Sequence, residues 1–329
     1  MNTQKILTLQ DILKPVEKSL AIVEDLVMKN LETDIPLLTE VGQYILKSGG
    51  KRIRPAMLLL ASGAFGEISE HACQAANVVE YIHTATLLHD DVVDNANLRR
   101  SKKSARSIWG NEASVLVGDY LFTVSFKFLA TFQNLRVIEA MSRATTMMAR
   151  GEILQLTRSY ETATLKDYLE IVDHKTSSLM GAAMEIGAIL GGAEESTQHS
   201  FYECGRHIGT CFQLIDDALD YEIDNTGLGK QAGTDLKERK ITLPLSHLLG
   251  EASDQDRTNI IDILDEDIIT DQHFSKVCQM IQKYGSLEYT IQQAGKFAEK
   301  AKKCLFDIPD NSCKQSIFQL IDFLVLRKK

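Results

Sequence analysis

Two short acidic strings carry the clearest chemical signal in this chain. They are Asp90-Asp91-Val92-Val93-Asp94 and Asp216-Asp217-Ala218-Leu219-Asp220, and each follows an apolar stretch with helical periodicity. The first and last aspartates of a string are four residues apart, so on a helix they share one face. Carboxylates held this close repel one another unless a cation neutralises them. Oxygen ligands, several to a site, suit a hard divalent ion, above all Mg²⁺.

One such string alone is more often a solvated helix face than a metal site. Here there are two, and basic residues accompany both. Gly49-Gly50-Lys51-Arg52-Ile53-Arg54-Pro55 places three cations beside a flexible glycine pair, a turn that can bring them onto a phosphate. Arg99 and Arg100 follow the first string, which suits a complex of metal and diphosphate. The alternatives are a cationic helix end that complements the macrodipole and Asp–Arg ion pairs.

Further polar residues lie near both strings. His83 is two helical turns before Asp90 on the same face, where it could contact a phosphate, although a lone helix histidine is usually structural. His89 points about 100° away from Asp90 around the helix and receives no role. Gln213 shares a face with Asp217. We expect Lys175-Thr176 at the start of a helix, where free N–H groups and the lysine would both favour an anion.

The segment 224–240 is rich in glycine and charge, and we interpret it as a mobile loop that could close over phosphates as a lid. Its cations are Lys230, Lys237, Arg239 and Lys240. Solvated loop charge is the alternative, and we prefer it for Lys237 and Arg239.

Helices must position these groups. Only five prolines interrupt 329 residues, which favours an all-α protein. We see no linker and no short-period repeat, so we predict a single domain over residues 1–329. The predicted helices cover residues 9–31, 36 to the glycine pair at 49–50, 70–94, 112–132, 135–159, 165–173, 176–190 and 197–221, and the chain is helical again from about 243.

Composition narrows the possible functions. The formal net charge of −9 argues against a nucleic-acid binder. The six cysteines form no CxxC pair, which is typical of reduced, packed thiols. No signal-like N-terminus and no apolar run approaching about 20 residues is evident, so we expect a cytoplasmic protein. The basic end 327–329 allows at most peripheral membrane contact. The sequence contains no nucleophile triad and no hydride-carrier motif. Its acidic strings and cations fit the metal-assisted departure of a diphosphate in an apolar cavity.

The ordered motifs resemble those of the trans-polyprenyl diphosphate synthases, the chain-elongating prenyltransferases. The motif sequences are most like those of the bacterial octaprenyl diphosphate synthases, and the resemblance is strong over roughly residues 40–245. The motifs are GGKRIRP (49–55), YIHTATLLHDDVVD (81–94), RR (99–100), GEILQL (151–156), KT (175–176), FQLIDDALDY (212–221) and LGKQAGTDLKERKITLP (228–244).

The resemblance implies an all-α prenyltransferase (isoprenoid synthase) helical bundle around a deep central cavity, usually as a homodimer. It also implies Mg²⁺, three ions per active site with substrate bound. Isopentenyl diphosphate would be held by Lys51, Arg54, His83 and Arg100. The metal would be bound by Asp90, Asp94, Asp216 and Asp220. The allylic diphosphate would be held by Arg99, Lys175, Thr176, Gln213, Lys230 and Lys240. The catalytic residues would be Asp90, Asp94, Asp216, Lys175 and Arg99.

The resemblance further implies an octaprenyl product, built on a farnesyl starter and used for quinone side chains. Ala85 and Thr86, five and four residues before Asp90, are small, whereas a bulky aromatic residue there stops elongation early in this family. Tyr81 and Met141, with Phe128 and Leu129, are candidates for a deeper floor, and core packing is the alternative for each. The other functions that we weigh are a shorter-chain geranylgeranyl or farnesyl diphosphate synthase, a terpene cyclase and a non-catalytic synthase subunit. The second DDxxD disfavours the last two.

Overall fold

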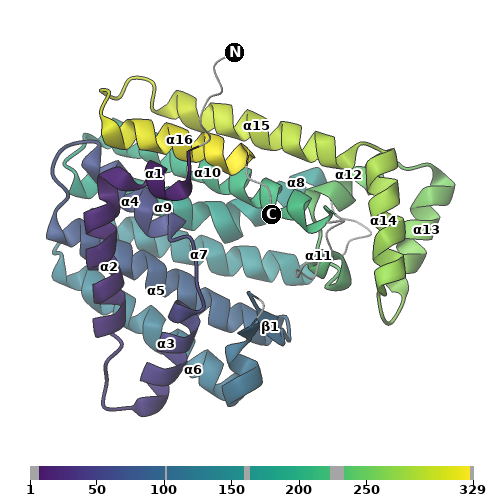
Figure 1. Ribbon diagram of the computed structural model, residues 1–329, viewed down its shortest axis with the longest axis horizontal. Helices are drawn as coiled ribbons and strands as arrows, with labels where there is room; N and C mark the ends of the chain where they lie inside the picture. Colours follow the sequence, from purple (N-terminus) through teal and green to yellow (C-terminus); the bar gives the residue numbers. More distant parts are fainter. Residues whose placement is uncertain (1–6, 101, 159–163, 223–232, 327–329) are drawn as a thin grey trace. The chain divides into compact units, whose positions relative to one another are not determined.

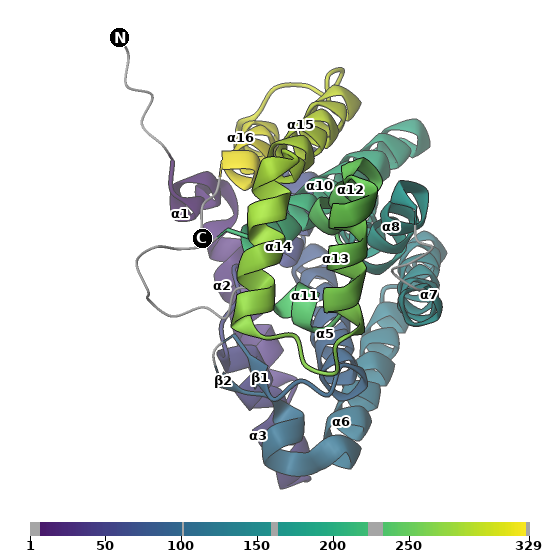
Figure 2. The ribbon, with the colours of Figure 1, turned by 90° about the vertical axis from the view of Figure 1, so that its right-hand side faces the viewer.

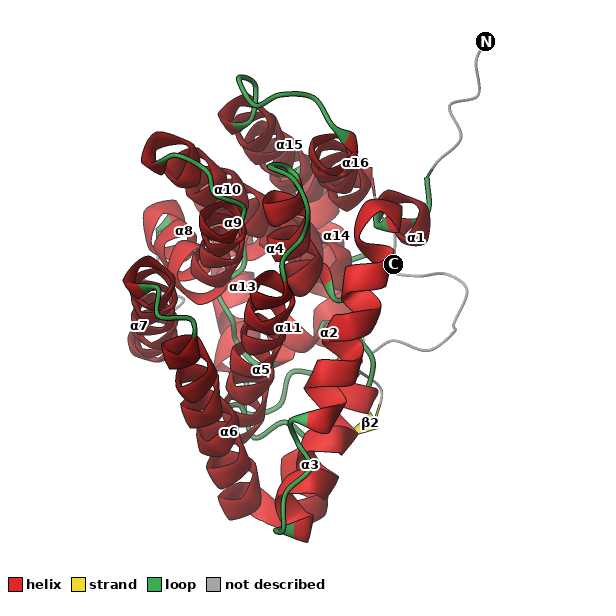
Figure 3. Ribbon diagram, turned by 90° about the vertical axis from the view of Figure 1, so that its left-hand side faces the viewer, coloured by secondary structure: helices red, strands yellow, loops and turns green. Residues whose placement is uncertain are grey.

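The fold is all-α, as the sequence predicts. The computed structural model describes residues 7–100, 102–158, 164–222 and 233–326, and 79% of the structure is helical. Within these residues the strands are β1 (Leu98–Arg99) and β2 (Lys102–Lys103), which pair antiparallel with Leu98 opposite Lys103. Figure 3 shows how completely helices dominate the chain.

Contacts divide the chain into two compact units. The first contains residues 1–145, 179–205 and 304–320, and the second contains residues 146–178, 206–303 and 321–329. One acidic string lies in each unit, 90–94 in the first and 216–220 in the second. The single domain that we expect from the sequence stays a prediction.

The helices of the first unit include a short 3₁₀ turn at Lys14–Val16. They are α1 (Leu9–Ile12), α2 (Glu17–Lys29), α3 (Pro36–Lys47), α4 (Ile53–Gly63), α5 (Glu70–Val93) and α6 (Ala105–Thr131). The second unit contains α8 (Leu165–Val172), the π-helix η2 (Asp173–Ser177), α11 (Thr234–Lys237), α12 (Leu243–Glu251), α13 (Asp254–Asp265) and α14 (Asp271–Lys283). Residues of both units belong to α7 (Leu135–Thr157), α9 (Ser178–Leu190), α10 (Glu195–Asp220), α15 (Ser286–Cys304) and α16 (Ser312–Leu326).

The first helix and the one predicted from residue 112 differ from the sequence-based prediction. The helix expected over residues 9–31 is broken at Pro15, because proline lacks an N–H and its ring clashes with the preceding turn. The helix expected from residue 112 starts earlier, at Ala105, where the Ser104 side chain accepts a hydrogen bond from the Ser107 N–H as an N-cap. Gly110, with φ at 88°, kinks this helix where the hydrophobic pattern had suggested a start.

Helix α5 lies at the core of the first unit and carries the first string. It is capped by Ser69, runs for 24 residues and contacts α2, α4 and α6 (Figure 1). Its small and branched residues are buried on several faces, which is typical of a core helix. Burial is complete at Ala85 and Leu88, and Asp90 and Asp94 are only partly buried. The helix therefore brings the string from the core to the edge of the unit.

In the second unit a separate hydrophobic cluster follows the second string directly. Tyr221, the residue after Asp220, is buried and stacks on Phe274 with ring centroids 6.1 Å apart. Leu236, Leu248 and other apolar residues of α11 to α14 complete the cluster. Figure 2 shows α13 beside α14, which it contacts. The end of α10 is thus anchored in a packed core.

Two expectations from composition have different outcomes. All six cysteines are free thiols, as predicted. The expectation that no apolar run approaches a membrane span is wrong for α6, because by length and composition it could cross a membrane, and an 18-residue stretch of it has a mean hydropathy of 1.4. Length and composition alone do not distinguish a span from a core helix, and α6 packs along α5 within the first unit.

Helix α9 approaches α4 so closely at Gly187 that a Cβ there would lie 2.2 Å from the Leu58 carbonyl oxygen. We expect Gly187→Ala to lower the free energy of unfolding by about 1–3 kcal/mol, because the added methyl group overpacks this contact. Urea denaturation measures the change. Gly295→Ala is the matched control, since nothing lies within 4 Å of its added Cβ, and it should stabilise α15 by up to about 1 kcal/mol. Equal effects of the two substitutions would contradict the packing argument.

Candidate active site

The first string divides into a buried aspartate and two partly exposed ones. Asp91 is fully buried, and its Oδ1 accepts a hydrogen bond from Arg99 Nε at 2.6 Å. Asp91 Oδ2 is buried without a hydrogen-bond partner among the described residues. Burial raises the pKa of Asp91, and the Arg99 guanidinium opposes that rise. Asp91 therefore anchors Arg99, while Asp90 and Asp94, which are partly buried, share another face of the helix.

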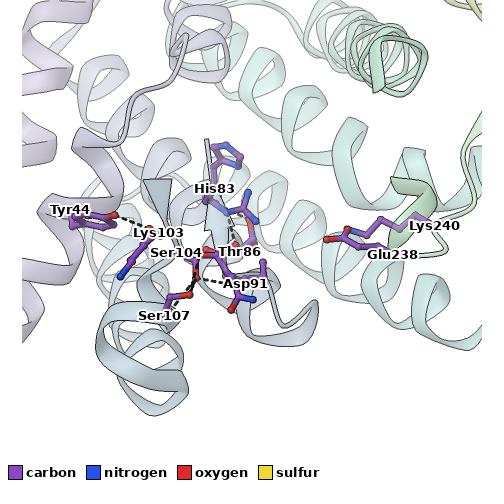
Figure 4. Close-up of polar contacts among 12 residues, drawn as sticks. Tyr44, His83, Thr86, Asp91, Lys103, Ser104, Ser107, Glu238 and Lys240 are labelled. Carbon is purple, nitrogen blue, oxygen red and sulfur yellow. Dashed lines mark hydrogen bonds and ion pairs between the residues drawn. The ribbon is translucent and has the colours of Figure 1, made fainter. Parts of the chain in front are cut away.

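The segment after the first string folds back onto it. The Ala96 N–H donates to the Asp91 carbonyl at 2.9 Å, and Ser104 Oγ donates to the Ala96 carbonyl at 2.6 Å. The segment contains the β1–β2 hairpin. The Tyr44 hydroxyl donates to the Lys103 carbonyl at 2.7 Å and ties the hairpin to α3 (Figure 4).

The glycine-flanked basic motif forms a compact ion-pair network in the same unit. Arg52 adopts a left-handed backbone with φ at 47°, uncommon for a residue with a side chain. Its guanidinium donates to Glu80 and to Glu24, the latter at 2.5 Å. Arg100, also left-handed with φ at 50°, places its guanidinium 3.1 Å from where a Cβ on Gly50 would stand. The structure thus brings the RR motif onto the GGKRIRP motif.

Arg54 and His83 meet inside this network. Arg54 Nη1 lies 3.1 Å from His83 Nε2, and arginine can only donate, so the histidine nitrogen accepts and the ring is neutral with its hydrogen on Nδ1. Burial, together with Arg54, Arg100, Arg99 and Arg52, lowers the pKa of His83 well below its usual value. Burial also lowers the pKa of Arg54 to about 10. Arg54 Nε is buried without a partner among the described residues, which suits an incoming anion.

The sequence reading missed the carboxylates that balance these cations. Glu80 is buried, and its charge opposes the lowering of the pKa values of both Arg54 and Arg100. It stands three residues before His83 on α5, so helical spacing could have placed it beside that histidine. Glu24 on α2 has no comparable signal, because only the tertiary fold brings it to Arg52. Lys51, the remaining predicted cation of this group, is exposed.

The candidate chain-length residues belong to three helices: Tyr81, Ala85 and Thr86 to α5, Phe128 and Leu129 to α6, and Met141 to α7. Ala85, Tyr81 and Met141 are fully buried, and the Tyr81 hydroxyl donates to the Val27 carbonyl at 2.8 Å. Thr86 is half-buried, and its hydroxyl donates to the His83 carbonyl (Figure 4). Phe128 is half-buried and Leu129 is buried. Their role in product length stays a prediction.

The second string repeats the arrangement of the first. Asp217, the middle residue, is buried, whereas Asp216 and Asp220 are partly exposed. The Tyr168 hydroxyl donates to Asp217 Oδ2 at 2.6 Å, and Gln213 Nε2 donates to Oδ1 at 2.8 Å. Burial raises the pKa of Asp217 to about 6, and the nearby Asp220 charge adds to the rise. Neither Asp217 nor Tyr168 stood among the predicted site residues.

Lys175 and Thr176 do not begin a helix, and the expected anion site at a helix N-terminus is wrong. They lie within η2, a π-helical insertion in a continuous helical run from α8 to α9. Such insertions often mark functional sites because they re-aim side chains. Lys175 Nζ contacts Glu152 Oε2 at 2.5 Å and Gln155 Oε1 at 3.2 Å.

The GEILQL motif on α7 allows this packing. A Cβ on Gly151 would lie 2.7 Å from the Lys175 backbone nitrogen, so no larger residue fits there without a shift. Thr176 Oγ1 donates to Gln213 Oε1 at 2.9 Å. The predicted residues Lys175, Thr176 and Gln213 are therefore brought together within the second unit.

The segment after the second string adds a further carboxylate. The Asp235 N–H donates to Asp220 Oδ2 at 3.0 Å, and burial with the charges of Asp217 and Asp220 raises the pKa of Asp235 well above its usual value. Lys240 pairs with Glu238 at 2.7 Å (Figure 4). Lys230 and most of the proposed lid lie outside the described residues.

The two other cations of this segment make contacts within the second unit. Lys237 pairs with Asp271 at 2.7 Å. Arg239 Nε donates to the Leu264 carbonyl at 2.8 Å. Both contacts are within the second unit, and the Lys237–Asp271 pair is exposed to solvent.

The outer aspartates fit Mg²⁺ in their donor chemistry. In each string the two outer carboxylates share a face, and the buried middle carboxylate is already bonded to protein groups. Among the described residues no three His, Cys, Asp or Glu side chains form a ready-made metal cage. Mg²⁺ usually binds one or two carboxylates together with substrate phosphates, so such a cage is not required.

Comparisons with known proteins agree with this geometry. The polyprenyl synthetase family model matches residues 35–281. The chain is 38% identical over its whole length to the octaprenyl diphosphate synthase of Escherichia coli K12, also covered completely. It is 37% identical to an all-trans-nonaprenyl-diphosphate synthase of Rhodobacter capsulatus, covering 94% of this chain and 95% of the relative. A polyprenyl synthase structure from Caulobacter crescentus, complexed with calcium and isoprenyl diphosphate, superposes with a TM-score of 0.92 at 35% identity, covering 99% of this chain and all of the other.

The chain therefore belongs to the polyprenyl synthetase family, an all-α class of isoprenoid synthases. It is a prenyltransferase. Because its full-length relatives make octaprenyl and nonaprenyl diphosphates, it is more narrowly a long-chain trans-polyprenyl diphosphate synthase. The resemblance seen in the motifs is thus confirmed, and the roles of individual residues stay predictions.

We expect His83 to remain neutral well below pH 6.5, because burial and four neighbouring arginines disfavour its protonation. Nuclear magnetic resonance of ring-labelled histidine should show the Nδ1–H tautomer and a pKa below that of the urea-unfolded chain. In the unfolded chain the ring takes up a proton near pH 6.5. Between the folded and unfolded pKa values the unfolded state binds more protons, so this histidine's contribution to stability is full above pH 6.5 and is lost as the pH falls below it. A folded-state pKa at or above 6.5 would contradict the assignment.

Proposed function

We propose that this chain builds octaprenyl diphosphate for quinone side chains by adding isopentenyl diphosphate units, with Mg²⁺, to a farnesyl diphosphate starter. The observation that carries the proposal is the common design of the two strings, in which a buried middle aspartate leaves two outer carboxylates on one accessible face. The octaprenyl length is supported by the Escherichia coli relative, which covers the whole chain. A homodimer and three ions per site are proposed from the family resemblance.

The cation network of the first unit would hold the diphosphate of isopentenyl diphosphate. Arg54 offers the buried Nε–H, and neutral His83 offers its Nδ1–H. Arg100 lies beside the glycine pair and adds charge from the hairpin. Glu80 keeps the arginines from repelling one another before the anion arrives, so the network is organised in advance.

The second unit would hold the allylic diphosphate through Lys175, Thr176, Gln213 and Lys240, and Arg99 of the first unit is added on the family resemblance alone. Asp90, Asp94, Asp216 and Asp220 would hold Mg²⁺, which, when bound, supplies positive charge that stabilises the departing diphosphate. The allylic carbon–oxygen bond breaks, and the alkene of isopentenyl diphosphate attacks the allylic cation. A proton then leaves to the departed diphosphate, so the chain supplies position and charge rather than a side-chain base.

We expect the purified chain to elongate farnesyl diphosphate with isopentenyl diphosphate and Mg²⁺, and Asp90→Ala and Asp216→Ala to lower kcat more than about 100-fold with the fold intact. The reason is that each change removes a group that stabilises charge in the transition state. Radiolabelled isopentenyl diphosphate incorporation measures the rate, and circular dichroism checks the fold. Asp262→Ala, an exposed aspartate on α13, is the control and should behave as wild type. Near-normal rates in both string variants would refute the metal assignment.

We expect Thr86→Phe to shorten the products, because an aromatic ring at this half-buried position of α5 would obstruct the growing tail. Reversed-phase chromatography of the dephosphorylated products measures their length. Thr86→Val, which keeps the size of the side chain, should leave the length unchanged. If the phenylalanine variant makes products of wild-type length, the tail grows along another path.

A further inference from the structure

Tyr168 lies at the head of a hydrogen-bonded chain in the second unit. It is buried on α8, one turn after the Thr164 N-cap, and its hydroxyl donates to Asp217 Oδ2 at 2.6 Å. Gln213 Nε2 donates to Asp217 Oδ1 at 2.8 Å, and Thr176 Oγ1 donates to Gln213 Oε1 at 2.9 Å. Four side chains from three helical segments, α8, α10 and η2, are thus joined in series.

This chain determines how the last turn of α10 is oriented. Both oxygens of Asp217 accept hydrogen bonds, so its side chain is held by the protein rather than available to a cation. On a helix Asp216 and Asp220 are offset from Asp217 by about 100° and 300°, so a fixed Asp217 fixes the direction of both. The same bonds orient Gln213 and, through it, Thr176 on the π-helical segment.

We propose that Tyr168 is a positioning residue that acts through Asp217 to aim the second string and the Lys175-Thr176 segment at a diphosphate with its divalent cations. This inference rests on the proposed function. In this proposal Tyr168 acts only through its hydrogen bond to Asp217. Its hydroxyl orients a buried carboxylate, and a ring without that hydroxyl would leave Asp217 Oδ2 without its hydrogen-bond donor.

The test is Tyr168→Phe, which keeps the ring and removes only the hydroxyl. Isothermal titration with inorganic diphosphate in Mg²⁺ should show binding weakened about 10-fold, the lower end of the effect of losing a group that orients a metal ligand. The Mg²⁺ concentration for half-maximal activity should rise by a similar factor. The KM for isopentenyl diphosphate should not change, because the first unit holds that substrate in the proposed function.

Tyr284→Phe is the matched control. Its hydroxyl also donates to a carboxylate of the second unit, Asp256 Oδ2, at 2.7 Å, but outside the chain described above. It should bind diphosphate as wild type does, even if its thermal stability falls as far as that of Tyr168→Phe. If both variants bind diphosphate equally well, Tyr168 is only structural and the inference is overturned.

Asp217→Asn provides a second route to the same answer. It keeps the size of the side chain and loses one acceptor, so it should weaken diphosphate binding in the same way, and it carries the test if Tyr168→Phe does not fold. Because Tyr168 acts through Asp217, the variant that carries both substitutions should bind diphosphate as tightly as the single variant with the weaker binding. Losses that multiply would overturn the inference. A wild-type chain that binds no diphosphate with Mg²⁺ would instead refute the proposed function on which it rests.

Discussion

The site depends on the burial of one carboxylate in each acidic string. A carboxylate withdrawn from water is costly unless strong hydrogen bonds replace the lost solvation. Asp91 obtains one from Arg99, and Asp217 obtains them from Tyr168 and Gln213. Because each anchor is directional, it also fixes the rotation of the helix end that bears it. The two outer aspartates of each string then stay on one face of the helix, although their like charges repel one another.

The same constraint links the carboxylates to the cations around them. Arg99 is held by Asp91 before any anion arrives, and Gln213 holds Thr176 while it is itself held by Asp217. In the first unit Glu80 and Glu24 pair with Arg52, and the backbones of Arg52 and Arg100 are left-handed. Because these polar groups are already oriented before the reaction, they need to move less when charge develops in the transition state.

The packed helices explain why these anchors can exist at all. Helix α5 is buried over most of its length, so Asp91 enters a region from which water is excluded. In the second unit, Gly151 lets α7 approach the Lys175 backbone, and the π-helical insertion turns Lys175 toward Glu152 and Gln155. Large residues at such contacts would separate the helices and with them the polar groups.

By itself the sequence determined the helical class, the length of α5 and the family, because helical periodicity and short motifs are local properties. It could not separate the anchoring aspartates, Asp91 and Asp217, from the outer ones, since all six share one residue type and burial is set by distant segments. Nor could it place Lys175 within a π-helix or bring Glu24 to Arg52 and Tyr168 to Asp217. Those contacts join residues far apart along the chain. Only the packing of helices in three dimensions decides which polar groups are buried side by side, and buried polar groups must form hydrogen bonds with one another because water no longer reaches them.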